Sequence, residues 1–200
     1  MVEQLLVKMS PRPPADLCKL CEVDLDDAAL PLLEGQPTPS DFLRGLIEAG
    51  LHADAVAYLA HGLPRREAVW WGCQCARETA PAAGSADADA LGAAEAWVYD
   101  PDDEHRIAAE QTVDAAGLRS PAGLLAQGVA WSGGSLAPAD LPEVTPPEHL
   151  TGRMVSAAVM VTATRLSAQE LPETLARFLA RGIEIAMGKR QGGKDSAGKG

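Results

Sequence analysis

Four cysteines are the residues of this sequence with the most obvious chemical potential. Cys18 and Cys21 are three residues apart, and Cys73 and Cys75 are two residues apart. A zinc site needs thiolates that converge on one ion. On a helix, residues two apart point about 200° from each other, so Cys73 and Cys75 cannot face the same ion. We therefore expect buried, reduced thiols, no metal site and no other cofactor.

Two catalytic interpretations lack the surroundings that they need. A redox C-x-x-C at residues 18–21 should follow a strand in a βαβ unit, and no such pattern precedes it. The stretch "WSGGS" at 131–135 lacks the G-x-S-x-G spacing of a hydrolase, and Gly133 and Gly134 are typical of a helix C-terminus. We predict no catalytic residue, and the sequence favours a protein that is not an enzyme.

An acidic cluster lies at Asp100 and at residues 102–104. It lacks the spacing and the glycine of a calcium-binding loop. Acidic residues stabilise the first turn of a helix, and proline is common at the first helical position. We therefore expect Asp100 to cap a helix that begins at Pro101.

Arg65 and Arg66 lie in an unusual place for positive charge. Pro64 predicts the start of a helix here, and the N-terminal end of a helix disfavours cations. Glu67 offsets the two arginines only in part. The arginines should therefore have an acidic partner.

That partner is either internal or on another protein. The internal candidates are Asp54 and a carboxylate from residues 100–104. If the partner is another protein, Arg65 and Arg66 become candidates for its binding surface. His61 and Trp70 nearby would suit an interface anchor, because aromatic and arginine side chains anchor many interfaces. Charge reversal of both arginines should then abolish binding and leave folding intact.

The composition predicts that these residues are carried on helices. The chain has 200 residues, 46% hydrophobic, with 36 alanines but only four isoleucines and eight aromatic residues. Alanine is the best helix former, whereas strands need β-branched and aromatic residues. We predict an all-α fold of about eight helices, arranged as a compact αα-hairpin bundle or as a short helical-repeat-like stack.

Local patterns place several of these helices. Thr38 and Ser120 are each followed by proline, as expected of an N-cap. The segment 64–76 is apolar on two faces and should be buried on both, with Trp70, Trp71 and Trp97 mostly in the core. We expect residues 1–13 to be a flexible lead, residues 14–188 a single helical domain, and residues 189–200 a disordered basic tail.

Charge and hydropathy restrict the partners and the compartment. The net charge of −11 argues against nucleic acids and anionic membranes. The N-terminal residues lack a signal-like apolar run, and Arg65-Arg66 is too far along the chain for a twin-arginine signal. We expect a cytoplasmic protein with a protein partner, or one that forms a homo-oligomer.

A proline-rich stretch at residues 136–147 is the longest irregular segment and a candidate functional surface. It follows directly after "WSGGS", so we add that motif to the candidate partner-binding residues. These are Trp131, Ser132, Gly133, Gly134 and Ser135. The alternative is a small-ligand or enzymatic pocket between helices at the same five residues.

Several stretches resemble an uncharacterised bacterial family, a domain of unknown function with an LPxREAVWW…WSGGS signature. They are "LPRREAVWWGCQCAR", "EAWVYDPDDEHRIAAE", "SPAGLLAQGVAWSGGSLAP" and "GIEIAMG", within residues 15–188. Members are sometimes mislabelled as twin-arginine signal proteins, and the C-x-x-C at 18–21 is not part of the pattern.

The resemblance implies a cytosolic bacterial protein with genes near those of type VI secretion or forkhead-associated signalling. It transfers no catalytic residue. Together with the patterns above, it predicts a non-enzymatic interaction module, an accessory or adaptor protein of a type VI secretion system.

Overall fold

The computed structural model describes residues 6–137 and 140–188, and these residues form helices and no β-strand. The predicted all-α class is confirmed. The described α-helices are α1 (Pro14–Leu20), α2 (Pro39–Glu48), α3 (His52–Gly62), α4 (Arg65–Ala76), α5 (Ala86–Tyr99), α6 (Asp103–Ala116), α7 (Pro121–Ala130), α8 (His149–Leu166) and α9 (Leu171–Ala186). Two short 3-10 helices, η1 (Asp27–Leu33) and η2 (Arg77–Thr79), lie between them.

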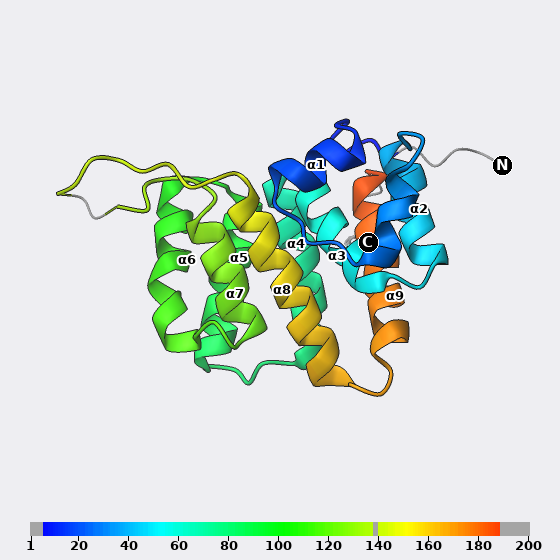
Figure 1. Cartoon of the computed structure of the whole chain (residues 1–200). Helices are drawn as coiled ribbons and strands as arrows, with labels where there is room; N and C mark the ends of the chain where they lie inside the picture. Colours follow the sequence, from blue (N-terminus) through cyan, green and yellow to red (C-terminus); the bar gives the residue numbers. More distant parts are fainter. Residues whose placement is uncertain (1–5, 138–139, 189–200) are drawn as a thin grey trace, which may run out of the picture.

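The helices pack as a compact bundle with α4 and α8 at its centre (Figure 1). Helices α5, α6 and α7 contact one another on one side, and α2, α3 and α9 lie on the other. Helix α4 contacts helices of both groups and also α8. This arrangement fits a helix that is apolar on two faces, as the sequence predicts for residues 64–76.

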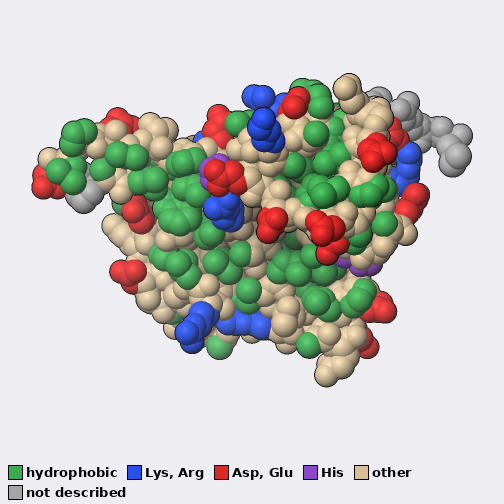
Figure 2. Space-filling view, viewed as in Figure 1, with side chains coloured by type: hydrophobic (Ala, Val, Ile, Leu, Met, Phe, Trp, Pro, Cys, Tyr) green, Lys and Arg blue, Asp and Glu red, His purple; other side chains and the backbone are tan. Residues whose placement is uncertain are grey.

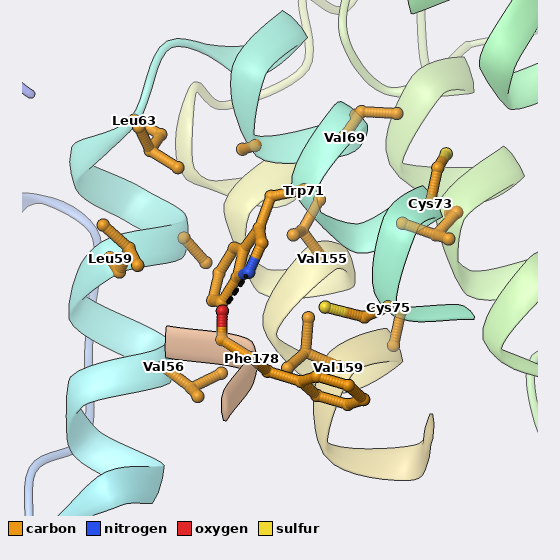
Figure 3. Packing of buried hydrophobic residues seen from close by; sticks show 14 of the residues in the cluster. Val56, Leu59, Leu63, Val69, Trp71, Cys73, Cys75, Val155, Val159 and Phe178 are labelled. Carbon is orange, nitrogen blue, oxygen red and sulfur yellow. Dashed lines mark hydrogen bonds between the residues drawn. The ribbon is translucent and has the colours of Figure 1, made fainter. Parts of the chain in front are cut away.

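The side chain of Trp71 forms the middle of the core (Figure 3). It is fully buried, and its indole Nε1 donates a hydrogen bond of 2.8 Å to the carbonyl oxygen of Phe178 in α9. Gly182, one turn further along α9, leaves room for the indole, because a Cβ there would lie 2.8 Å from the ring. The central helix and the C-terminal helix are thereby packed at close range.

Helix α4 is buried as predicted, with one correction. Trp71 and Trp97 are in the core, but Trp70 has 38% of its surface exposed. The interpretation of Trp70 as a core residue is therefore wrong. The residues next to Trp70 in the sequence are buried and occupy the faces of α4 that pack against other helices. The side chain of Trp70 therefore lies on the remaining face, toward solvent.

The N-caps show where local sequence determines a helix start. Thr38 and Ser120 cap α2 and α7 through their side chains, as predicted. Asp100 does not cap α6: it follows the end of α5, and Asp102 makes the cap by accepting a hydrogen bond from the amide of His105. Several adjacent acids satisfy the same preference, so the spacing alone could not select among them.

The segment before α1 was expected to be a flexible lead, and its described part makes specific contacts. The amide of Lys8 donates to the carbonyl of Ala186, and the amide of Ser10 donates to that of Gly62. Met9 is buried, with its methyl group against Gly62. The predicted tail, residues 189–200, lies outside the described residues.

In the described ranges, no helix has both the length and the apolar character that crossing a lipid bilayer requires.

Candidate functional site

Arg65 and Arg66 bind the C-terminal ends of two other helices. Arg65 donates a hydrogen bond of 2.8 Å to the carbonyl of Ser132, just after α7. Arg66 donates to the carbonyls of Val98 and Tyr99 at the end of α5, at 2.6 and 3.3 Å. The last carbonyls of a helix have no partner within that helix and carry partial negative charge. Two cations at the start of α4 therefore stabilise two neighbouring helix ends.

The expected internal carboxylate partner of these arginines is wrong. Asp54 instead accepts a hydrogen bond from the amide of Asp26, and neither arginine forms an ion pair within the described residues. The charge of the arginines predicts an acidic side chain as their partner, whereas the carbonyl ends of α5 and α7 supply the negative charge from the backbone.

A third arginine holds the end of α7 from the other side. Arg106 of α6 donates a hydrogen bond of 3.4 Å to the carbonyl of Ala130 and forms an ion pair with Asp103. Its guanidinium covers Gly134, where a Cβ would come within 2.7 Å of it. Gly134 has a φ of 69°, in the left-handed region that glycine favours. It does not end α7, because the helix stops at Ala130 with Trp131 as its C-cap. The expectation that Gly133 and Gly134 form the helix C-terminus is therefore wrong, and Gly133 is not among the glycines with a positive φ.

Residues 131–135 are thus brought together with Arg65 as a braced turn. Trp131, Ser132, Gly133 and Gly134 are partly buried, and Ser135 is exposed. The guanidinium of Arg106 fills the space beside Gly134 in this turn.

The loop that leaves this turn is closed at its base by Ser135. The hydroxyl of Ser135 accepts hydrogen bonds from the amides of Ala137 and Val144, both at 3.0 Å. The amide of Leu136 donates to the carbonyl of Val144 at 2.8 Å. These contacts join the two arms of the loop, which projects from the body of the bundle (Figure 1).

The projecting loop presents apolar side chains to solvent. Leu136, Leu141 and Val144 are 42%, 57% and 50% exposed. Asp140 and Glu143 lie between them in the sequence and are also exposed. Figure 2 shows hydrophobic and acidic side chains side by side on this projection.

Two exposed aromatic residues belong to the same end of the molecule. Trp70 lies one turn after Arg66 on α4, and Tyr99, whose carbonyl Arg66 binds, is 87% exposed. The sequence did not indicate Tyr99 as a surface residue. In the sequence, Tyr99 is only an aromatic residue near the end of an expected helix, and that position does not show whether the side chain is exposed.

The cysteines lie in apolar surroundings that suppress their reactivity. All four are free and buried. Burial raises the pKa of Cys18 to about 11 and that of Cys75 to about 12. Such thiols stay protonated near neutral pH, and only a thiolate attacks or binds metal.

Asp100, Asp102 and His105 are the one group in the described chain whose acidic or imidazole ligand atoms gather closely enough for a metal ion. The same oxygen of Asp102 accepts from the amide of His105 and lies 2.8 Å from its Nδ1. Hydrogen bonding to Asp102 raises the pKa of His105. These contacts account for the cluster as a helix cap.

A cavity of about 460 Å³ opens elsewhere, where residues 8–12 cross the junction of α3 and α4. Its lining includes Arg65 and Gly152, but not residues 131–135. The molecule therefore has a cavity of a size suited to a small ligand, but this cavity is not at residues 131–135, where the sequence suggested one.

The fold and the site together define an all-helical bundle that presents a braced, apolar loop. The chain belongs to a family of unknown function, DUF6931, whose model matches residues 42–186. This confirms the resemblance to an uncharacterised domain family, while the LPxREAVWW and WSGGS signature stays a prediction. The matched range begins after Cys18 and Cys21. Neither the curated proteins nor the solved structures give a match.

Proposed function

We propose that this protein is a non-enzymatic interaction module that binds a protein partner through its projecting loop. The observation that carries this proposal is the exposure of Leu136, Leu141 and Val144 on a loop that Ser135 closes at its base. Exposed apolar side chains grouped on one element are typical of binding surfaces. Trp70 and Tyr99, at the same end of the bundle, extend the surface with aromatic side chains that commonly anchor interfaces.

The braced base supports this role energetically. Ordering a loop on binding costs conformational entropy, and a loop that is already closed has lost part of that entropy beforehand. The acidic residues Asp140 and Glu143 favour a partner with an apolar groove flanked by basic side chains. The net charge of −11 would accelerate encounter with such a partner.

The family resemblance suggests which partner to test first. An accessory or adaptor role in a bacterial type VI secretion system would make a cytoplasmic component of that machine the partner. Self-association through the same loop is the competing outcome. A second copy would supply a matching apolar surface, but its acidic residues would repel those of the first copy.

The test compares two leucine substitutions of equal chemistry. Leu141→Ser alters the loop, and Leu118→Ser alters a similarly exposed leucine, 52% exposed, at the opposite end of α7. Affinity purification from the native host with mass spectrometry should recover a partner with wild type and Leu118→Ser, and lose it with Leu141→Ser. Equal recovery by both variants would exclude the loop as the binding surface.

Ser135→Ala tests the braced base separately. It removes the acceptor for the amides of Ala137 and Val144 and leaves the apolar side chains in place. Affinity for the recovered partner should fall by about three- to tenfold, with an unchanged melting temperature. An unchanged affinity would show that the closed loop contributes nothing to binding. Sedimentation of the purified protein distinguishes a second copy from a different partner.

A further inference from the structure

The cavity at the junction of α3 and α4 combines two kinds of lining. Met9, Leu17, Leu20 and Leu63 supply apolar surface. Lys8, Arg12 and Arg65 supply positive charge. At about 460 Å³, its volume is in the range of small-molecule sites.

Positive charge predominates at this cavity although the protein as a whole is acidic. Lys8 forms an ion pair of 3.1 Å with Glu67, and Glu148 is the one carboxylate among the lining residues. Arg65 is held by the carbonyl of Ser132. Arg12 is exposed, and its guanidinium has no hydrogen bond or ion pair to any described residue. One cation is therefore available to a ligand without breaking an internal contact.

His61 also lines the cavity. Burial lowers its pKa most, and the neighbouring His149 and Arg153 lower it further. Arg153 is itself paired with Glu22 at 3.2 Å. The imidazole is thus neutral at neutral pH, and it adds hydrogen-bonding capacity beside the cations.

We propose that this cavity binds a small organic anion, a carboxylate or phosphate ester that carries an apolar group. The anionic group would lie against Arg12, and the apolar group against Met9 and Leu20. The cap of α4 is consistent with this orientation, since Pro64 offers no capping side chain to the first turn. Residues from 8–21 that line the cavity lie outside the range matched by the family model. The lining does not include the projecting loop, so this site goes beyond the proposed interaction role.

Calorimetry with phenyl phosphate tests the site in the full-length protein. Phenyl phosphate should bind saturably, and inorganic phosphate and phenol should each bind more weakly, because each lacks one half of the recognised chemistry. Benzoate as a second probe distinguishes preference for a carboxylate from preference for a phosphate ester. In NMR spectra, the methyl signal of Met9 should shift with the bound fraction.

A matched pair of arginine variants locates the binding. Arg12→Gln removes the cation at the cavity, and Arg119→Gln removes an exposed arginine outside its lining that likewise has no side-chain partner among the described residues. Affinity should fall about fivefold with Arg12→Gln and stay unchanged with Arg119→Gln. Equal affinities in the two variants, or an unshifted Met9 methyl signal at saturation, would overturn the assignment. Leu141→Ser should leave phenyl phosphate binding unchanged, which separates this site from the loop.

Discussion

His61 is a side chain whose ionisation the fold changes, because burial and nearby charges lower its pKa. It lies where α3 meets α8, against Gly152, and a Cβ at that glycine would come within 2.5 Å of its Nδ1. Burial, and then the charges of His149 and Arg153, lowers its pKa from 6.5 to about 4. The folded protein therefore accepts a proton at His61 less readily than the unfolded chain does.

Stability should consequently fall in mildly acidic solution. Well above pH 6.5, His61 is neutral in both the folded and the unfolded state, and its titration has no effect on stability. Between pH 6.5 and about 4, the unfolded chain binds a proton that the folded protein excludes, so the free energy of unfolding decreases as the pH falls. The expected loss is about 2 kcal/mol, less than the full shift because the side chain is not wholly buried.

Urea denaturation at several pH values measures this effect. His61→Gln lacks the titrating group, so its free energy of unfolding should depend less on pH across the same interval. The difference between wild type and variant isolates His61 from the carboxylates, which titrate in both proteins. Parallel pH profiles would rule out the low pKa of His61.

At the scale of elements, the start of α4 is a structural junction rather than a free charged surface. Arg65 and Arg66 bind the carbonyl ends of α7 and α5. Replacing both with glutamate would place negative charge against two negative helix ends and remove three hydrogen bonds. We expect the double reversal to lower the free energy of unfolding by about 1–3 kcal/mol.

Thermal denaturation followed by circular dichroism checks this expectation. A control with the same change in net charge reverses Arg12 and Arg119, which have no side-chain partners among the described residues. The control should melt close to wild type, and the Arg65/Arg66 variant clearly below it. If both melt alike, the hydrogen bonds to α5 and α7 contribute little. Binding experiments that reverse these arginines would therefore confuse loss of folding with loss of a partner.

The elements also show what the sequence could predict. Thr38 and Ser120 form their caps with residues two or three positions away, so sequence alone was enough to place them. The partners of Arg65 and Arg66 are 67 and 32 residues away, in helix ends whose positions depend on the whole fold. The exposure of Trp70 and Tyr99 likewise depends on how the helices pack in the whole fold. The all-α class was predictable, whereas the surface and the cavity needed the tertiary arrangement.

At the scale of the whole molecule, α4 and α8 connect two groups of helices. The small residues of the chain permit this close packing. Gly182 of α9 lies on Trp71 and Leu59, and a Cβ there would meet them at 2.8 and 2.6 Å. Gly92 of α5 is also helical, but a Cβ there would find nothing within 4 Å. The two glycines therefore form a natural pair for substitution.

Alanine at these positions should have opposite effects. Gly92→Ala should stabilise the protein by about 0.5–1 kcal/mol, because alanine restricts the unfolded chain and favours the helix. Gly182→Ala should destabilise it by about 1–3 kcal/mol, because the fully buried indole of Trp71 cannot move away from the new methyl group without disturbing the core.

Native-state hydrogen exchange shows how far the second effect extends. If α4 and α8 couple the two groups of helices, Gly182→Ala should lower the protection of amides in α6 as much as that of amides in α3, although α6 is on the far side from α9. Loss of protection confined to α3 and α9 would show instead that the groups unfold separately. In that case α4 would stay packed against α5–α7 after α3 and α9 had unfolded. The contacts of Arg65 and Arg66 would explain this result, because they join the start of α4 to α5 and α7 and not to α3 or α9.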